Sequence, residues 1–314
     1  KGSSTRQEDY IEHLFVASTH PTLLIFTEMG RCFWLKVYEI PEGDKTSKGR
    51  ALQNMIQIPP DDKVRAIIDV KSLEDEDYVN NHYIVLCTKQ GIINKSRLKD
   101  FSRPRQNGIN AITIKEGDQL LEAKLTDGNC EIMMAVKSGR AIRFPELKVR
   151  PTGRGGIGVA GIDVDDATDE VVGMVCVNVE DKTKTVLVVS ANGYGKRTFL
   201  DDPETGEANY RITNRGGKGV KTISVTAKTG SLVGLLAVTE AEDLMITCVS
   251  GITIRMPVNQ ISEQGRATQG VKLIRVDDGD EIAAITQLDE KEVEETVILD
   301  EEGNPIVAEA LADE

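Results

Sequence analysis

Basic side chains recur at two fixed positions along this sequence of 314 residues, in a pattern suited to binding phosphate groups. The first position lies four residues after a turn glycine and holds Lys95, Arg143, Arg197 and Arg255. The second lies just before a loop glycine and holds Lys45, Arg103, Arg105, Arg154, Arg215 and Arg266. Further basic residues close to these positions are Arg31, Lys36, Arg97, Arg140, Arg150, Lys196, Arg211 and Lys218. Such side chains neutralise phosphates without reading bases.

The loops that carry some of these residues are rich in glycine. Residues 152–158 read TGRGGIG and residues 213–219 read TNRGGKG, so backbone amides could approach phosphate oxygens closely. Aromatic residues make up only 4% of the chain, which disfavours a protein that stacks single-stranded bases on rings. The pattern favours duplex DNA that is held by its backbone and bent. The alternative is that surface strands carry lysine and arginine without any function.

Catalysis has little support in the sequence. The three histidines, His13, His20 and His82, are far apart and not at metal-ligand spacing, and the carboxylates fall in turns. Residues 153–158 satisfy GxGxxG, but they open a predicted strand and cannot provide a helix N-terminus for a pyrophosphate. We therefore expect no catalytic residue, metal or cofactor in this domain.

The cysteines and the apolar runs indicate the compartment. The five cysteines form no CxxC pair and lie within apolar strand-like runs, which favours reduced, buried thiols over disulfides or zinc ligands. No apolar run approaches the roughly 18 residues that span a bilayer, and KGSSTRQEDY contains no signal-peptide core. A cytosolic protein with no membrane contact is expected.

The basic positions belong to an internal repeat. A short apolar run, a turn glycine and an alternating strand occur five times, around Gly30, Gly91, Gly139, Gly193 and Gly251. Four of the hairpins are followed by a polar loop that ends in glycine, an apolar residue, two further residues and isoleucine, as in NGINAI at 107–112, and the copy after the first hairpin, KGRALQNMI at 48–56, is looser. An acidic or polar turn and another strand close each unit. Each repeat is therefore expected to contain about four strands.

Short runs of aliphatic and β-branched residues between glycine turns, without a helical period, predict an all-β fold. Four-stranded antiparallel blades arranged in a ring would leave only short sheet edges exposed. The blades are expected at residues 21–72, 80–128, 130–180, 183–240 and 242–288, after a partial first blade at 1–20, within a domain that covers 1–287. A position repeated in each blade is repeated around the rim, so the basic side chains should form a curved belt.

Charge is distributed unevenly along the chain. The formal net charge is −13, but residues 288–314 contain eleven acidic residues and one lysine, which leaves only −3 for the rest. Residues 91–158 contain 13 basic and 7 acidic residues. We expect a basic middle region and an acidic, flexible tail at 289–314.

Several segments together resemble a known family. They are HLFVASTH at 13–20, LKVYEIPE at 35–42, NGYGKRT at 192–198, NRGGKGV at 214–220 and GRATQGVKLIR at 265–275. Over nearly all of residues 1–287, the chain is similar to the C-terminal domain of the bacterial DNA gyrase A subunit. The resemblance implies a six-bladed β-pinwheel in which blades exchange strands and the rim wraps double-stranded DNA, so that gyrase can introduce negative supercoils using ATP.

The resemblance also implies how this domain relates to the rest of the enzyme. The DNA-cleaving tyrosine and the ATPase, with their ATP and Mg²⁺, would lie elsewhere in an A2B2 complex of the gyrase A and B subunits. That complex would work on the nucleoid in the bacterial cytoplasm, and the isolated domain would be a monomer.

The chain departs from the family pattern in one place. The hallmark box, a QRRGGKG-like loop of the first blade, is not seen where it is expected, because Lys1 and Gly2 fall at or just after its end. The similar segment at 214–219 belongs to the fifth blade by the family count, in which the partial blade at 1–20 is the first, and should not inherit the role of the box. Three alternatives remain: the corresponding domain of topoisomerase IV, a propeller that serves as a protein-interaction scaffold, and an enzyme with a site in its central channel.

Overall fold

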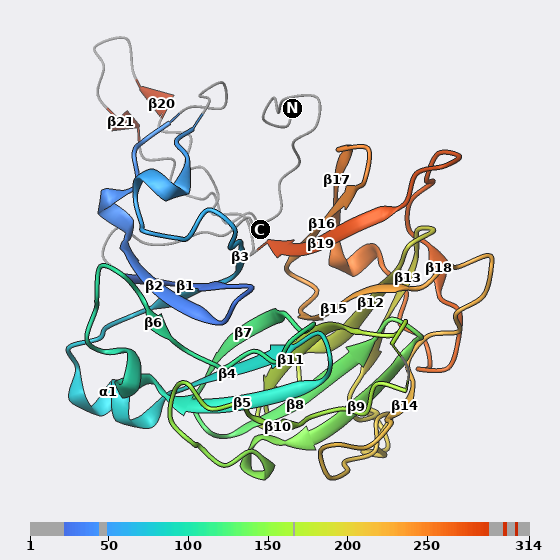
Figure 1. Cartoon of the computed structure of the whole chain (residues 1–314). Helices are drawn as coiled ribbons and strands as arrows, with labels where there is room; N and C mark the ends of the chain where they lie inside the picture. The colour runs from blue at the N-terminus through green and yellow to red at the C-terminus, as the bar shows by residue number, and fades with distance from the viewer. Residues whose placement is uncertain (1–21, 44–48, 166, 289–297, 300–304, 307–314) are drawn as a thin grey trace.

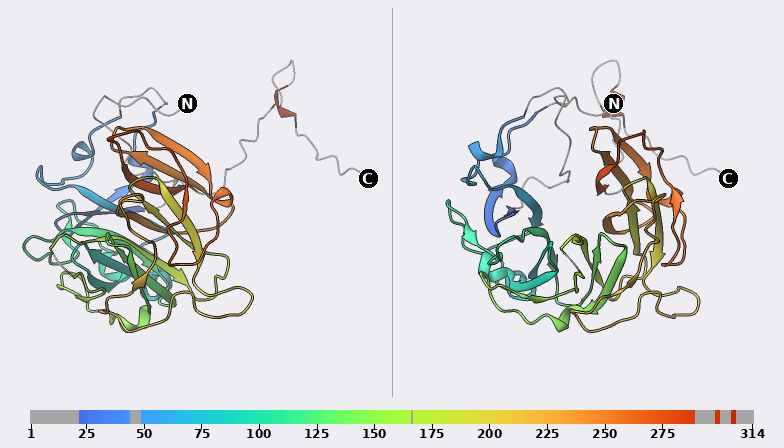
Figure 2. Two further views of the ribbon diagram at one scale, coloured as in Figure 1. Left: turned by 90° about the vertical axis from the view of Figure 1, so that its right-hand side faces the viewer. Right: turned by 45° about the vertical axis from the view of Figure 1, so that its right-hand side comes forward.

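The computed structural model describes residues 22–43, 49–165, 167–288, 298–299 and 305–306 (Figure 1). Five antiparallel sheets follow one another along the chain, four with four strands and one with three. They stand as blades around an open arc, with the first and last sheets at its two ends (Figure 2). The predicted all-β pinwheel is confirmed. The partial first blade expected at 1–20 lies outside the described residues.

Each sheet runs from a strand at the inner edge of its blade to a strand at the outer edge. In that order, the first sheet contains β3 (Val64–Val70), β1 (Thr22–Thr27), β2 (Arg31–Lys36) and β6 (Ile109–Asn110). The second contains β7 (Leu120–Thr126), β4 (Tyr83–Thr88), β5 (Ile92–Arg97) and β10 (Val159–Ala160). The third contains β11 (Val171–Asn178), β8 (Cys130–Val136), β9 (Arg140–Pro145) and β14 (Val220–Lys221).

The fourth sheet contains β15 (Leu232–Val238), β12 (Thr185–Ser190), β13 (Tyr194–Phe199) and β18 (Val271–Lys272). The fifth contains β19 (Ile282–Leu288), β16 (Asp243–Cys248) and β17 (Thr253–Pro257). Within the expected tail, β20 (Ile298–Leu299) pairs with β21 (Pro305–Ile306), and the rest of 289–314 lies outside the described residues. The inner strands β3, β7, β11, β15 and β19 pack against one another in this order.

The outer strand of each four-stranded blade comes from the following repeat. Val159 and Ala160 pair with Ile93 and Ile92 of the preceding blade, and β14 pairs in the same way with β9. Blades are therefore not continuous in sequence, which corrects the predicted boundaries. A blade consists of three strands of its own repeat and a two-residue strand of the next, as the strand exchange of the pinwheel implies.

The two glycines of the repeat are required by this exchange. Gly219 has φ +75°, and a Cβ atom there would overlap the carbonyl oxygen of Ala141 in the preceding blade. The turn glycine Gly139 has φ +91° and lies similarly close to the carbonyl oxygen of Ile223. Thr222 N donates to the oxygen of Gly139 over 2.8 Å. The residues between the loop glycine and the isoleucine therefore attach one blade to the previous one.

Blade-to-blade packing explains why the central strands lack an alternating pattern. All six residues of β1 and of β12 are buried. Alternate side chains of β12 enter different cores: Val186 and Val188 pack toward the third blade, and Leu187 and Val189 toward the fifth. A strand buried on both faces needs apolar residues at successive positions, and only the terminal residues of β1 and β12 are polar.

Short 3-10 turns form the corners that follow the third strand of most blades. They are η1 (Val37–Glu39), η3 (Leu98–Phe101), η4 (Glu146–Lys148) and η5 (Val258–Gln260), and a further turn, η2, spans Leu52–Asn54. One α-helix, α1 (Glu76–Asn81), precedes β4 and was not predicted. The Asp75 side chain caps it by accepting from the amides of Asp77 and Tyr78.

Gly219→Ala should destabilise the domain more than Gly206→Ala. Both glycines have positive φ, at +75° and +72°, but a Cβ atom at 206 would meet nothing within 4 Å. Gly206→Ala should lower the free energy of unfolding by about 1–2 kcal/mol, the cost of the backbone conformation alone. Gly219→Ala should add about 1–3 kcal/mol because the loop must move off β9. Urea unfolding measures both, and equal losses would contradict the close approach of the two blades.

Candidate nucleic-acid interface

The loops that lead into the exchanged strands lie on the outer edge of the arc. Each loop crosses to the preceding blade, and three of the four described loops bond to the backbone of its third strand. Thr152 N donates to Lys95 O over 3.0 Å, Thr213 N to Arg143 O over 2.9 Å, and Gln264 N to Arg197 O over 2.9 Å. The loops are therefore fixed to the sheets, and what they carry is presented at the blade edges.

Eight of the predicted basic residues lie exposed, all but Arg255 on or beside these loops. The exposed ones are Arg97, Arg103, Arg105, Arg150, Arg154, Arg211, Lys218 and Arg255. Arg140, Arg215 and Arg266 are partly buried and bond to backbone carbonyls of neighbouring segments, while Lys45 lies outside the described residues. The crossing loops thus bring basic side chains to the outer edge of four consecutive blades. Their contact with DNA stays a prediction.

Four predicted belt residues are not on the surface. Lys95, Arg143, Lys196 and Arg197 are at most 4% exposed. They cannot contact a phosphate from these positions, so their assignment to the belt is corrected. Three of them, Lys95, Arg143 and Arg197, occupy the position four residues after the turn glycine, which therefore has a structural role.

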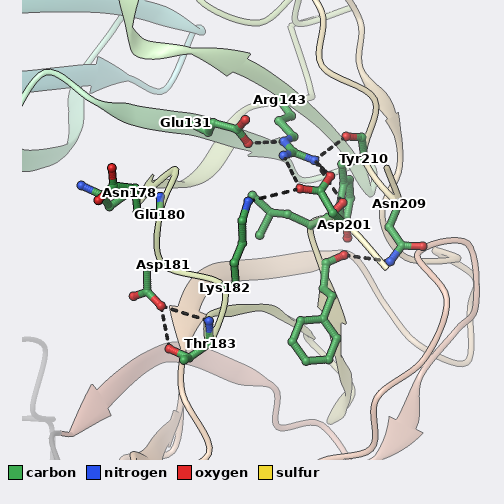
Figure 3. A network of polar contacts seen from close by, with 12 residues as sticks. Glu131, Arg143, Asn178, Glu180, Asp181, Lys182, Thr183, Asp201, Asn209 and Tyr210 are labelled. Atoms are coloured by element: carbon green, nitrogen blue, oxygen red, sulfur yellow. Dashed lines mark hydrogen bonds and ion pairs between the residues drawn. The ribbon is translucent and has the colours of Figure 1, made fainter. Parts of the chain in front are cut away.

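Arg143 shows what that position does (Figure 3). Its Nη1 donates to the carbonyl oxygens of Leu200 and Tyr210, at 3.0 and 2.9 Å, in the next blade. The guanidinium also pairs with Asp201 at 2.6 Å and with Glu131 of the neighbouring strand. The hydrogen bond from Arg143 holds the pKa of Asp201 below its ordinary value. Arg143 is a latch between the third and fourth blades.

Equivalent residues make equivalent latches elsewhere in the arc. Arg197 Nε donates to Ile261 O of the fifth blade over 2.8 Å, and Lys95 Nζ lies 2.9 Å from Glu146 Oε1 in the corner of the third. In the first described blade Trp34 takes this role, donating to Phe101 O over 2.9 Å. Basic residues recur four residues after the turn glycine because only a long side chain with a hydrogen-bond donor at its end can reach the next blade.

An acidic residue partly neutralises the candidate interface. Asp165 pairs with Lys218 at 2.8 Å and with Arg140 at 2.9 Å. Its hydrogen bond and charge raise the pKa of Lys218. A phosphate that approaches this part of the edge would compete with Asp165.

Some exposed basic residues of the same edge were missed from the sequence. Lys148 lies in η4, and Lys221 and Lys272 end the exchanged strands β14 and β18. The signal was present, because GVK follows the polar loop in both repeats. Only the strand exchange shows that these lysines lie at the outer edge.

The closest arrangement to a metal site within the described residues is Asp127, Cys130 and Glu146, whose ligand atoms lie within 4.8 Å of one another. Glu146 already accepts from Thr126 Oγ1 at 2.5 Å and from the amide of Cys130 at 3.1 Å, in addition to pairing with Lys95. An ammonium group bound to the carboxylate opposes a cation, so we assign no metal there. All five cysteines are free thiols.

These features define a class of protein: a strand-exchanged β-propeller whose outer edge carries a row of basic loops. The family model "DNA gyrase C-terminal domain, beta-propeller" matches residues 21–71, 82–127, 131–178, 184–202, 205–239 and 242–289. The chain belongs to this family. No helix in the described ranges is long and apolar enough to cross a membrane.

Curated relatives agree with this assignment. The DNA gyrase A subunit of Staphylococcus aureus (strain NCTC 8325 / PS 47) is 41% identical over 296 residues, which cover 94% of this chain and 32% of the relative. The protein of the same name from strain MRSA252 is 39% identical over 318 residues, 100% of this chain and 34% of the relative. The chain therefore spans about a third of the length of these relatives.

Two solved structures share the fold. A DNA gyrase A C-terminal domain superposes with a TM-score of 0.70 at 24% identity and covers 86% of this chain and 83% of that one. A C-terminal domain of DNA topoisomerase IV gives a TM-score of 0.74 at 22% identity, over 86% of this chain and 80% of that one. At this level of identity, the likeness shows the architecture alone.

Arg143→Ala should destabilise the domain by about 3 kcal/mol, since it leaves carboxylates and carbonyls without their buried donor. Arg150→Ala, an exposed control, should change stability by no more than about 0.5 kcal/mol. The pKa of Asp201 is lowered in the fold, so the Arg143–Asp201 pair stabilises the protein only while Asp201 is ionised. The part of the destabilisation that comes from this pair should be complete above a pH of about 4 and disappear as Asp201 protonates at lower pH. Urea unfolding at pH 7 and pH 3 measures this. Equal stability of both variants at pH 7 would contradict the latch.

Proposed function

We propose that this domain binds duplex DNA along the outer edge of its blades and bends it there. The observation that carries the proposal is the placement of basic residues on loops that cross from blade to blade. Because these loops are bonded to the sheets, the charges follow the curve of the arc. A phosphate backbone that follows the same curve would meet one loop per blade.

The chemistry of the edge suits a contact that does not depend on base sequence. Arginine and lysine predominate on the loops, and the buried aromatic side chains Phe26, Phe101 and Phe144 are part of the cores between blades, while Phe33 packs within the first described repeat. Binding by charge and curvature would favour DNA that bends easily, rather than a particular sequence.

For the whole protein, we propose the role that the relatives' name carries. The domain would be a non-catalytic part of the gyrase A subunit. It would wrap DNA so that an ATP-dependent type II topoisomerase introduces negative supercoils. The cleaving tyrosine, the ATPase and their Mg²⁺ would belong to other parts of an A2B2 complex with the gyrase B subunit. The complex would act in the bacterial cytoplasm, and the isolated domain would be monomeric.

The corresponding domain of topoisomerase IV is the second candidate. The fold does not distinguish the two candidates, because the TM-scores are 0.74 for the topoisomerase IV domain and 0.70 for the gyrase domain. The 41% identity to a gyrase A subunit over nearly the whole chain favours gyrase.

Salt dependence tests the proposed function. If on the order of 6 phosphates are neutralised, log K for a duplex should fall with log salt with a slope of about −5. Fluorescence anisotropy with two unrelated duplexes of equal length should give the same slope and similar affinities. Equal affinity at low and high salt, or binding restricted to one sequence, would contradict the proposal.

Asp165→Asn should strengthen DNA binding, because it releases Arg140 and Lys218 from a competing carboxylate. We expect a gain of about threefold to tenfold at low salt, shrinking as salt screens the interaction. Asp69→Asn is the matched control, since it makes the same change on the inner strand β3. If both substitutions increase DNA affinity equally, the change in net charge rather than the crossing loop explains the effect.

A further inference from the structure

Lys196 is a buried lysine that pairs with no carboxylate among the residues the structure describes. Its side chain is fully buried, and Nζ donates to backbone oxygens of Gly265 at 2.7 Å, Arg266 at 2.6 Å and Thr268 at 3.0 Å. The hydroxyl oxygen of Thr268 lies 3.1 Å from the same nitrogen. Four oxygens of one loop thus surround the ammonium group, and that loop is the one that crosses from the fifth repeat onto β13.

The residues that follow Lys196 fix the remainder of the loop. Arg197 N donates to Ser262 O over 3.0 Å, and Thr198 Oγ1 donates to Gln264 O over 2.7 Å. The segment KRT at 196–198 is therefore a clamp for residues 261–268. The clamped loop carries Arg266, whose Nη1 donates to Lys221 O over 3.1 Å.

The equivalent positions in the other blades hold no titratable group. Three residues after the turn glycine stand Phe33, Asn94, Ile142 and Ile254. Asn94 also lies beneath a crossing loop, where its Nδ2 approaches Thr152 Oγ1 at 3.4 Å. Among the five described blades, a buried ammonium group beneath the loop is therefore found only in the fourth, and packing alone does not require it.

We propose that Lys196 is a positioning residue for DNA binding, whose buried ammonium group holds residues 264–268 in the shape that presents Arg266 to a phosphate. The inference rests on the proposed function and adds to it that the Lys196 side chain must be protonated. An ammonium group has three hydrogens for the loop oxygens, whereas the neutral amine has two and carries no charge. DNA affinity should therefore depend on the protonation of this one side chain.

The surroundings of Lys196 bring its pKa close to neutral pH. Burial, with a smaller contribution from the charge of Arg266, lowers the pKa of Lys196 to about 7. The other ionisable side chains in and around the clamp are Arg197, Glu240, Glu263, Tyr210 and Lys221. A phosphate at Arg266 would favour the charged form and raise the pKa of Lys196 in the complex, so DNA binding should take up a proton.

The first test uses the unaltered protein. Titration calorimetry of a duplex at pH 7.5, in two buffers with different ionisation enthalpies, should show net proton uptake. Affinity should accordingly fall as pH rises from 7 to 9, by at most about tenfold per pH unit for a single proton. Binding without proton uptake would overturn the inference and leave the proposed function intact, whereas no binding at any pH would overturn both.

Variants show whether Lys196 is the side chain that takes up this proton. Lys196→Met should weaken binding at pH 7 by on the order of tenfold, the effect of losing one charged donor, and should flatten the pH profile. Lys196→Arg keeps a charge at every pH, so it should bind better than Lys196→Met and be equally insensitive to pH. Asn94→Ala is the matched control at the same place in another blade, and it should keep the slope of the unaltered protein.

A double-mutant cycle shows whether Lys196 acts through the loop. Arg266→Ala should cost less affinity in the Lys196→Met background than in the unaltered protein, because the loop has already lost its shape. Parallel pH profiles for the unaltered protein, Lys196→Met and Lys196→Arg would contradict the proposal. So would additive effects of Lys196→Met and Arg266→Ala.

Discussion

The attachment of each blade to its predecessor is the interaction on which the rest of the structure depends. A three-stranded blade has an open outer edge, and the next repeat closes it with two residues of strand. That short pairing positions the loop in front of it on the outer edge, as Gly219 and Val220 do against Ala141. The same attachment therefore builds the arc and sets the place of every basic loop.

Arginine and lysine serve two purposes in this arrangement, and distance from the turn glycine separates them. Most side chains four residues after it point into the junction with the next blade, where Arg143 and Arg197 donate to backbone carbonyls, whereas Arg255 in the last described blade is exposed. Side chains on the crossing loops, such as Arg105 and Arg154, face outward. The inner set ties neighbouring blades together, and we propose that the outer set bends DNA along the arc that results.

Sequence reasoning reached the repeat, the all-β blades and the crossing loops, because glycine turns and apolar strands are local signals. It assigned Lys95, Arg143, Lys196 and Arg197 to the surface, since an alternating pattern shows which residues share a face but not that both faces are covered by neighbouring blades. It also drew blades as continuous segments. A two-residue strand such as Val220–Lys221 has no sequence pattern of its own, so its pairing with β9 could only be seen in space.

Lysine acetylation footprinting with a saturating duplex tests the central claim most directly, because lysines lie on both edges of the blades. If DNA follows the outer edge, it should protect Lys148, Lys218, Lys221 and Lys272, which are exposed there, and leave Lys124 of the inner strand β7 as reactive as before. Protection of Lys124 with unchanged reactivity at Lys218, Lys221 and Lys272 would place DNA at the centre of the arc and contradict the claim.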